Sequence, residues 1–558
     1  MSEAWWKKAT VYQIYPKSFN DTTGNGVGDI PGIIEKLDYL KELGIDVIWL
    51  TPVYQSPQKD NGYDISDYYS IEPMYGTMDD FERLLDETHK RGMKLIMDLV
   101  INHTSTEHEW FKQSAFSKTN SYRDFYIWKD PVDGHEPTNW ESKFGGSAWK
   151  YDENSGQYYL HLFDVTQADL NWENPEVREK LVEMIRFWAE KGIDGFRLDV
   201  INLISKDQRF PNDESGDGRK FYTDGPRVHE YLHEMNQAAF SPHDMMTVGE
   251  MSSTTLENCI LYTNPERKEL DMTFQFHHLK VDYPNGEKWT KAPFDFIELK
   301  RILSHWQVGM YKGGGWNALF WCNHDQPRVV SRFGDEEKYH KESAKMLATT
   351  IHMMQGTPYV YQGEEIGMTN PGFTSIDQYR DVESLNAYEI LKQKGKSDKE
   401  IIEILQQKSR DNARTPMQWS DGKNGGFTNG TPWIELAGNY KEINAEKVVK
   451  YPYSIFSHYQ KLIELRKKYD IITYGDYELL LEDHPQIFAY TRKWENERLI
   501  VVNNFYAEEV TVKLPINGLK VLISNYEDSP KETDEIKLRA YESVVYWGQE
   551  HPEGQEPW

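Results

Sequence analysis

The sequence predicts an α/β protein whose parallel strands close into a (β/α)8 TIM barrel, with an irregular inserted subdomain and a C-terminal antiparallel β-domain. Three observations predict this fold. A unit of helix, glycine and apolar strand recurs, eight apolar strand-like runs occur before residue 364, and two long segments break the pattern. Because parallel neighbours need a crossover connection that is usually a helix, the repeated unit predicts a parallel sheet covered by helices.

Three units carry the repeat most clearly. A helix is expected over residues 32–43, where isoleucine and leucine recur at helical spacing before Gly44. Thr77 is expected to cap the second helix, and Asn174 with Pro175 to start the third. The eight expected strands span residues 9–16, 45–52, 93–103, 192–200, 246–251, 270–276, 316–323 and 357–363.

Two segments depart from this rhythm. Residues 104–171 are rich in Trp, Tyr, Gly, Ser and Asn without a helical period, and we expect an irregular inserted subdomain there. Residues 474–558 contain runs such as LIVVNNFY and ESVVYWG that alternate like antiparallel strands, so a C-terminal β-domain is expected. The barrel is then formed by residues 1–103 and 172–473.

Composition limits the classes of partner. The 63 Lys and Arg against 90 Asp and Glu give a net charge of -27, which argues against binding to nucleic acid or to an anionic membrane surface. Two cysteines provide no disulfide framework, no secretory signal pattern is recognisable, and no apolar run is long enough for a membrane span. We therefore expect a cytoplasmic protein. A monomer is expected, with a dimer as the alternative.

Charged residues lie at the carboxyl ends of four expected strands. In GIDGFRLDVINLI, Arg197 and Asp199 are two residues apart, so their side chains point to the same side of the strand. A buried ion pair seldom adds stability, which favours chemistry over a strand-end salt bridge. In a barrel these strand ends meet at one mouth, and burying several carboxylates there is too costly to be incidental. The other charged strand-end residues are Asp98, His103, Glu250, His324 and Asp325.

These segments carry a family resemblance. DLVINH, GFRLD, TVGEM and FWCNHDQ, in this order, resemble the four signature regions of the α-amylase superfamily of glycoside hydrolases, and QADLNW resembles its fifth. The resemblance runs from VYQIYPKSF through the C-terminal β-domain. QKDNGYDISDY and SRDNARTPMQW resemble the oligo-1,6-glucosidase group, and MSSTT, FHHLKVDYPNGEKW and GGGWNALFWCNHDQPRVVSRFG resemble the trehalose-6-phosphate hydrolases within that group.

The resemblance implies a retaining, exo-acting α-glucosidase. Its substrate would be a phosphorylated disaccharide, trehalose 6-phosphate, cleaved to glucose and glucose 6-phosphate through a covalent glucosyl-enzyme intermediate. An oligo-1,6-glucosidase acting on isomaltose-type oligosaccharides is the alternative. A noncatalytic member of the superfamily is disfavoured, because such members lose the catalytic carboxylates and carry a membrane span, whereas this sequence keeps the carboxylates.

The resemblance also assigns roles to the strand-end residues. Asp199 would be the nucleophile, Glu250 the general acid and then base with a raised pKa, and Asp325 the carboxylate that holds ring hydroxyls in the transition state. Arg197 would keep Asp199 ionised, because a nearby guanidinium favours the charged form of a carboxyl group. Asp98 would orient Arg197. This two-carboxylate mechanism needs no cofactor.

Further residues are implied as sugar contacts. His103 and His324 would donate to sugar hydroxyls. Asp60 and Arg410 would form a pair that caps the nonreducing glucose, with Tyr63 stacking on it, and Arg414 is the alternative to Arg410 for this contact.

The phosphate needs a local basic cluster in a protein of such negative charge. Candidates lie in the segment after the sixth strand and in the segment after the fourth, where they would supply charge-assisted hydrogen bonds. The alternative is that each is an ordinary solvated surface charge. The candidates are Lys280, Lys288 and His278 in the first segment and Lys206 and Arg209 in the second.

Residues 21–29, DTTGNGVGD, space oxygen donors in the alternating manner of a calcium loop. Relatives of the superfamily bind calcium there, although Thr23 and Asn25 stand where acidic residues are common, which lowers the charge of the site. We expect a structural calcium ion; a metal-free glycine-rich turn is the alternative. The donors would be Asp21, Thr23, Asn25, the carbonyl of Val27 and Asp29.

Overall fold

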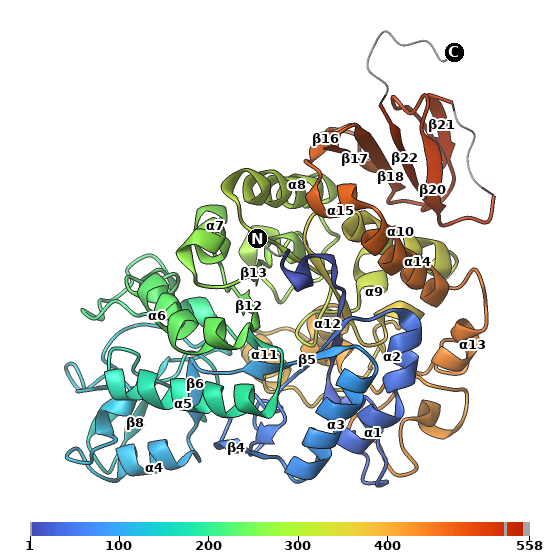
Figure 1. Ribbon diagram of the computed structural model, residues 1–558. Coiled ribbons are helices and arrows are strands. Elements are labelled where there is room, and N and C mark those ends of the chain that lie inside the picture. Colours follow the sequence, from blue (N-terminus) through green and yellow to red (C-terminus); the bar gives the residue numbers. More distant parts are fainter. Residues whose placement is uncertain (1–2, 529–532, 551–558) are drawn as a thin grey trace.

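Eight parallel strands form a single sheet, and helices surround the central strands of the molecule (Figure 1). The computed structural model describes residues 3–528 and 533–550. A parallel bridge between Thr273 and Asn317 joins the two outer strands of the sheet and closes the barrel. In sheet order the strands are β13 (Met272–Phe274), β12 (Met246–Glu250), β11 (Gly195–Leu198), β5 (Lys94–Leu99), β2 (Val47–Leu50), β1 (Val11–Ile14), β15 (Thr357–Tyr361) and β14 (Ala318–Leu319). The predicted fold class is therefore confirmed, and each expected strand contains one of these eight.

The register of neighbouring strands sets which side chains meet at the mouth. Arg197 on β11 is aligned with Asp98 on β5, and Leu198 is aligned with Gly249 on β12. Asp199 follows Leu198 directly, and Glu250 follows Gly249 directly. Because parallel strands in register bring their carboxyl ends to one edge, these two carboxylates emerge at the same level of the barrel.

Helix boundaries follow local signals in the sequence. Thr77 and Asp80 form a capping box at the start of α3 (Met78–Lys90), and Asn174 caps α5 (Pro175–Lys191), which ends at Gly192 with φ 104°. The prediction of a single helix over residues 32–43 is wrong. The helix is divided at Lys36 into α1 (Ile30–Glu35) and α2 (Leu37–Leu43), because the backbone of Lys36 leaves the helical region with φ -105° and ψ 6°.

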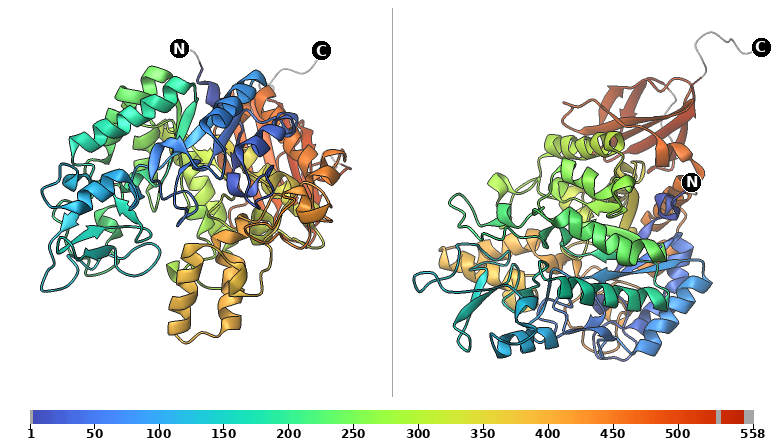
Figure 2. Two further views of the ribbon diagram at one scale, coloured as in Figure 1. Left: turned by 90° about the horizontal axis from the view of Figure 1, so that it is seen from below. Right: turned by 60° about the vertical axis from the view of Figure 1, so that its left-hand side comes forward.

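The remaining helices cover the barrel or extend from it. They are α4 (Glu109–Phe116), α6 (Val228–Met235), α7 (Leu256–Thr263), α8 (Phe296–Gly313), α9 (Val329–Phe333), α10 (His340–His352), α11 (Val382–Gln393), α12 (Asp398–Lys408), α13 (Ala445–Val449), α14 (Ile455–Lys468) and α15 (Asp470–Tyr474). Helices α11 and α12 form a hairpin that projects from the body, beside the inserted segment (Figure 2). Among the described residues, no helix combines the length and apolar character needed to cross a lipid bilayer.

The inserted segment has a small sheet of its own. Strands β7 (Trp128–Lys129), β9 (Gln157–Leu160) and β8 (Trp149–Asp152) are antiparallel, and β6 (His103–Ser105) pairs with β10 (Gln167–Asp169) where the segment leaves and rejoins the barrel. Its apolar cluster includes Trp140, Trp149 and, from the segment that follows β11, Val200, Leu203 and Tyr222. The insert is therefore packed directly on the residue after Asp199.

The C-terminal domain is an antiparallel sheet buried on both faces. Strands β16 (Glu478–Leu480), β17 (Ile487–Trp494), β18 (Glu497–Asn504), β22 (Ser543–Gln549) and β20 (Lys520–Ser524) form it, and β19 (Val510–Lys513) pairs with β21 (Glu535–Leu538). Ile487 and Ala489 lie in the domain's own core, whereas Phe488 and Tyr490 lie in the core shared with the barrel. Because side chains alternate along a strand, β17 joins two apolar layers.

Arg492 on β17 fastens this domain to the barrel. Its guanidinium donates to the carbonyl oxygens of Met353 (2.6 Å), Ile472 (3.1 Å) and Gly475 (2.7 Å). Burial lowers the pKa of Arg492 to about 10, so the side chain remains charged at neutral pH.

Replacing Arg492 with methionine is expected to destabilise the protein. Arg492→Met leaves three buried carbonyl groups without a donor, and we expect the free energy of unfolding to fall by about 3 kcal/mol. A lower Tm in scanning calorimetry would show this loss. The neighbouring exposed Lys493 provides the control, since Lys493→Met removes a charge from the same strand without uncovering a carbonyl group. Equal Tm values for the two variants would contradict the prediction.

Candidate active site

Arg197 lies at the centre of a buried charge cluster at the mouth of the barrel. Its Nη1 donates to Asp199 Oδ1 (2.7 Å) and to Asp98 Oδ1 (3.0 Å), and its Nη2 contacts Glu250 Oε2. The Arg197 side chain is fully buried, with 0% exposed. The structure therefore brings together Asp98, Asp199 and Glu250 around one guanidinium group.

Burial and charge act in opposite directions on these carboxyl groups. Burial raises the pKa of Asp199, while the positive charge of Arg197 opposes that shift. Burial likewise raises the pKa of Asp98 to about 7 against the opposing effect of Arg197. Loss of Arg197 would remove the main group that favours the ionised form of either carboxyl.

A second charge cluster lies beside the first. Arg410 Nη2 donates to Asp60 Oδ1 (2.9 Å) and to Asp381 Oδ1 (2.6 Å), and Arg414 Nη2 donates to Asp325 Oδ1 (2.9 Å). The two alternatives left open by the sequence thus have different partners. Arg410 pairs with Asp60 and Arg414 pairs with Asp325, although Arg410 Nη1 also lies 3.3 Å from Asp325.

These guanidinium groups determine the charge of Asp325. Burial alone would raise the pKa of Asp325, but His324, Arg410 and Arg414 together hold it well below its usual range. Because its pKa is lowered, Asp325 is ionised at neutral pH. Its side chain is 26% exposed and is therefore accessible to a ligand.

The predicted aromatic and histidine contacts form one stack. The rings of Tyr63 and His324 are parallel with centroids 5.1 Å apart, and Tyr63 donates to Asp98 Oδ2 at 2.8 Å. Gln13 Nε2 lies 2.7 Å from His324 Nδ1, and burial lowers the pKa of His324 to about 3. Burial also lowers the pKa of His103, whose Nε2 lies 3.1 Å from the carbonyl oxygen of Tyr63. Both imidazoles are therefore neutral at pH 7 and hydrogen-bonded to the protein.

Several residues of the site were missed from the sequence. Asp381 is fully buried and binds Arg410, yet in the sequence it shows only the features of the helix cap that it also forms for α11. Gln167 Nε2 donates to Asp60 Oδ2 (3.0 Å), and Arg410 lies over the ring of Phe144 at 4.8 Å. The signal for Gln167 was its place in QADLNW; nothing in the sequence distinguished Phe144 from other aromatic residues.

The candidate phosphate residues have different surroundings. Lys206 Nζ binds Asp169 Oδ2 (2.8 Å) and Asn102 Oδ1 (2.9 Å) in the interior, and the buried ring of His278 lies between Gln275 and the carbonyl oxygen of Phe320. The structure thus gives both side chains internal partners.

Three candidates lie nearer the surface. Arg209 is 82% exposed and pairs with Asp207 on the same loop. Lys288 contacts Glu383 on α11, and Lys280 Nζ lies 3.4 Å from Ser253 Oγ. Ser253 follows Glu250 by three residues, so Lys280 is the candidate placed beside the catalytic strand ends.

The loop of residues 21–29 uses its carboxylate oxygens internally. Asp21 accepts from the backbone of Thr23, Gly24 and Gly26, and Asp29 accepts from Thr22 and Gly32. Within the described ranges, no three His, Cys, Asp or Glu side chains are grouped to hold a metal ion. Every carboxylate oxygen proposed as a calcium ligand already accepts a hydrogen bond, so these contacts do not favour a metal, and calcium binding stays a prediction.

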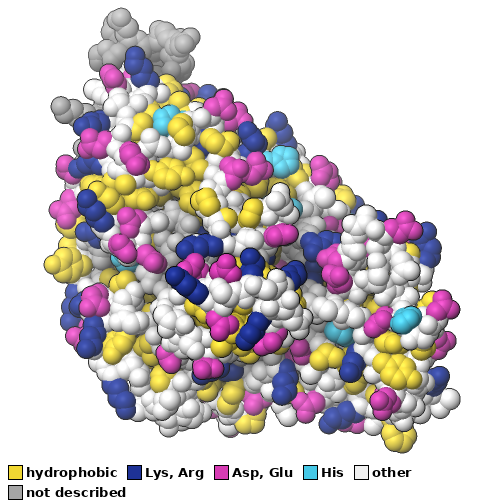
Figure 3. Space-filling model, turned by 180° about the vertical axis from the view of Figure 1, so that it is seen from behind, with side chains coloured by type: hydrophobic (Ala, Val, Ile, Leu, Met, Phe, Trp, Pro, Cys, Tyr) yellow, Lys and Arg dark blue, Asp and Glu magenta, His cyan; other side chains and the backbone are white. Residues whose placement is uncertain are grey.

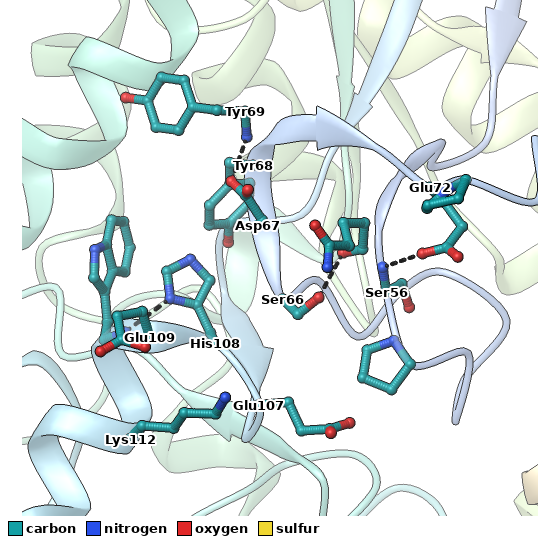
Figure 4. A pocket seen from close by; sticks show the side chains of 14 residues that line it. Ser56, Ser66, Asp67, Tyr68, Tyr69, Glu72, Glu107, His108, Glu109 and Lys112 are labelled. Atoms are coloured by element: carbon teal, nitrogen blue, oxygen red, sulfur yellow. Dashed lines mark hydrogen bonds between the residues drawn. The ribbon is translucent and has the colours of Figure 1, made fainter. Parts of the chain in front are cut away.

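A separate cavity of about 720 Å³ lies between the hairpin of β3 (Tyr54–Gln55) with β4 (Asp67–Ile71) and helix α4 (Figure 4). Its lining contains carboxylates from four residues and one lysine, Lys112. None of the predicted site residues lines it. The carboxylates lining this cavity are Asp67, Glu72, Glu107 and Glu109.

Family models match nearly the whole chain. The model for the alpha amylase catalytic domain matches residues 13–475, and the model for the alpha-amylase SusG C-terminal domain matches residues 487–545.

The similar proteins include trehalose-6-phosphate hydrolases and oligo-1,6-glucosidases. The chain is 68% identical to trehalose-6-phosphate hydrolase of Bacillus subtilis (strain 168), over 97% of this chain and 98% of that protein. It is 56% identical to oligo-1,6-glucosidase of Parageobacillus thermoglucosidasius, over 98% of this chain and 99% of that protein. The crystal structure of Bacillus licheniformis trehalose-6-phosphate hydrolase superimposes with a TM-score of 0.94 at 69% identity, covering 98% of this chain and 100% of that one.

The calcium prediction can be checked by thermal unfolding. A bound structural ion would stabilise the folded state, so added calcium should raise Tm and EDTA should lower it. A Tm that is the same in both conditions would show that residues 21–29 form a turn without a metal.

Asp381→Asn is expected to destabilise the site strongly. The change leaves Arg410 and Arg414 without their shared buried anion, and we expect a loss of about 3–5 kcal/mol. The guanidinium groups hold the pKa of Asp381 well below its usual range, against the effect of burial. Its stabilising contribution is therefore complete above the ordinary aspartate pKa of about 4 and is lost as the pH falls below it.

The difference in Tm between the parent and Asp381→Asn should accordingly shrink as the pH falls from about 5 to about 3. Asp377→Asn is the control, because Asp377 is exposed just before the same helix. A difference in Tm that stays constant over this pH range would contradict the assignment.

Proposed function

This chain belongs to the alpha-amylase family of glycoside hydrolases, and we propose on that premise that it hydrolyses trehalose 6-phosphate to glucose and glucose 6-phosphate. The observation that carries the substrate proposal is Lys280, a partly buried lysine with no carboxylate partner among the described residues, placed beside the segment that follows Glu250. The similarity to trehalose-6-phosphate hydrolases over nearly the whole chain supports the same substrate.

The proposed reaction uses the two carboxylates joined by Arg197. Asp199 attacks the anomeric carbon of the glucosyl unit while Glu250 donates a proton to the glycosidic oxygen, so that oxygen departs as a neutral hydroxyl group of glucose 6-phosphate. Glu250, now ionised, takes a proton from water, and the resulting nucleophile breaks the bond between glucose and Asp199. Two displacements at one carbon retain its configuration. Arg197 holds Asp199 and Glu250 in position during both displacements.

The second charge cluster accounts for the proposed binding of one terminal glucose. Arg410 and Asp60 form a buried pair behind the mouth, covered by the ring of Phe144. A longer oligosaccharide would have to displace this ion pair. Each buried charge would then lose its partner, which is unfavourable. We therefore propose that the enzyme removes single glucosyl units, and that Asp325 binds hydroxyls of the unit being transferred.

The phosphate would be bound on the opposite, leaving-group side. Lys280 is the strongest of the candidates, since Lys288 is already neutralised by contact with Glu383. The face seen in Figure 3 carries lysine and arginine side chains near its centre, interspersed with aspartate and glutamate, although the whole chain has a net charge of -27. Local cations are what an anionic substrate requires on an acidic protein.

An oligo-1,6-glucosidase activity is the second candidate. The near full-length similarity to oligo-1,6-glucosidases favours it, and it would use the same carboxylates with a neutral leaving sugar. The two candidates differ in the leaving group, which carries a phosphate in the first and is a neutral sugar in the second.

We also propose that the enzyme works as a cytoplasmic monomer. Cys259 and Cys322 are both buried and unpaired, as a reducing compartment permits. Sedimentation of the purified protein would check the monomer, because a mass of twice 65.6 kDa would contradict it.

The experiment that tests this function compares products from trehalose 6-phosphate, trehalose and isomaltose. We expect glucose and glucose 6-phosphate from the first at a much higher kcat/KM than from the others. Asp199→Asn should lower kcat by at least about 10³-fold, because it removes the nucleophile. Asp207→Asn is the matched control on the loop after the same strand, where, within the described part of the chain, the carboxylate forms an ion pair only with the exposed Arg209. Faster cleavage of isomaltose than of trehalose 6-phosphate would favour the second candidate instead.

A further inference from the structure

Three basic side chains come from three separate segments of the chain. Lys143 comes from the insert, Arg219 from the long loop after β11, and Lys280 from the segment after β13. Burial, followed by the charges of Arg219 and Lys280, lowers the pKa of Lys143 to about 7. Burial, followed by the charges of Arg219 and Lys288, lowers the pKa of Lys280 to about 8. Lys143 contacts the ring of Tyr222, three residues after Arg219, so the two basic residues belong to one region and their like charges oppose each other.

Two of these cations lack an anionic partner. Within residues 3–528 and 533–550, Lys143 and Lys280 form no salt bridge, and the ammonium group of Lys143 instead lies over the ring of Tyr222 at 5.5 Å. Interior lysines elsewhere are compensated: Lys206 binds Asp169, and Lys300 donates to three carbonyl oxygens. Gathering like charges without compensation costs stability, so the arrangement favours an anion that is supplied from outside.

A buried hydroxyl next to Lys143 points to the same conclusion. The Tyr222 side chain is completely buried, and its hydroxyl group has no hydrogen-bond partner among the described residues. Buried polar groups are nearly always satisfied, so an unpaired phenolic donor beside an unpaired ammonium indicates a missing acceptor.

The cluster is tied to both sides of the active site. Phe144, the residue after Lys143, packs its ring on Arg410 of the sugar pocket. Ser253, which contacts Lys280, follows Glu250 in the chain and has a left-handed backbone with φ 49°. The cluster is therefore connected both to the sugar pocket and to the segment that follows Glu250.

We propose that Lys143 and Arg219 join Lys280 in binding the phosphate of the leaving sugar, with the insert supplying the residue that selects phosphorylated over neutral substrates. This inference rests on the proposed function and names residues that the sequence had not indicated. Arg219 keeps its pairing with Asp217 (2.7 Å) and offers its remaining donors to the ligand. A phosphate carries close to two negative charges at neutral pH and accepts several charge-assisted hydrogen bonds.

The arrangement makes phosphate recognition depend on pH. Lys143 must be protonated to attract the anion, and in the free enzyme it loses that proton as the pH rises through about 7. KM for trehalose 6-phosphate should therefore rise between about pH 6.5 and about pH 8.5 by more than KM for nitrophenyl glucoside does. The charged and titratable groups that face Lys143 and its cluster are Arg219, Lys280, Lys288, Asp217, Glu141 and Tyr222.

The test measures the selectivity ratio, which is kcat/KM for trehalose 6-phosphate divided by kcat/KM for nitrophenyl glucoside. Lys143→Gln and Arg219→Gln should each lower this ratio about tenfold, as expected for the loss of one charge-assisted contact. Lys143→Arg, which keeps the charge, should retain most of it. Lys150→Gln is the matched control, because Lys150 is an exposed lysine on β8 of the same insert. Inhibition of nitrophenyl glucoside hydrolysis by glucose 6-phosphate should weaken in parallel in the two glutamine variants.

The outcomes separate the two levels of the proposal. A ratio that is unchanged in both glutamine variants, in a parent enzyme that prefers trehalose 6-phosphate to trehalose, would overturn this assignment and leave the proposed function standing. A parent enzyme without that preference would overturn the proposed function and this inference together.

Discussion

One buried guanidinium group determines how the mouth of this barrel is organised. Arg197 contacts three carboxylates from three neighbouring strands, and it has no exposed surface of its own. Without that cation the carboxyl groups could not be ionised so close together in a dry setting. The strand register explains how they meet, because Asp98 is aligned with Arg197 itself, while Asp199 and Glu250 each follow an aligned pair. Chemistry at this mouth thus depends on a sheet that is in register.

Much of this arrangement is legible in the sequence, for physical reasons. The barrel strands are short, apolar and followed by charged residues, so their ends and their common edge can be inferred from one chain. Caps such as Thr77 and Asn174 are local signals and were predicted correctly. The division of the first helix at Lys36 was not predicted, because residues 32–43 keep a continuous helical pattern across it.

The residues missed by sequence reasoning are those whose partners are distant in the chain. Asp381 resembles an ordinary helix cap, and only the fold brings Arg410 and Arg414 to it. Lys206 follows a catalytic strand, which made it a candidate for phosphate, yet the buried Asp169 of the insert binds it. Charge alone cannot distinguish a lysine that is neutralised by a distant carboxylate from one that is free to bind a ligand.

The insert influences the site more closely than its position as a peripheral segment suggests. Lys143 and Phe144 are adjacent in the chain, one facing the basic cluster and the other packed on Arg410. Because the two residues are joined by one peptide bond, the spacing is fixed between Phe144, which covers Arg410 in the sugar pocket, and Lys143, which is proposed to bind the phosphate. Adding or deleting one residue in this turn would change the span between the two groups, which offers evolution a short route from disaccharide to oligosaccharide substrates.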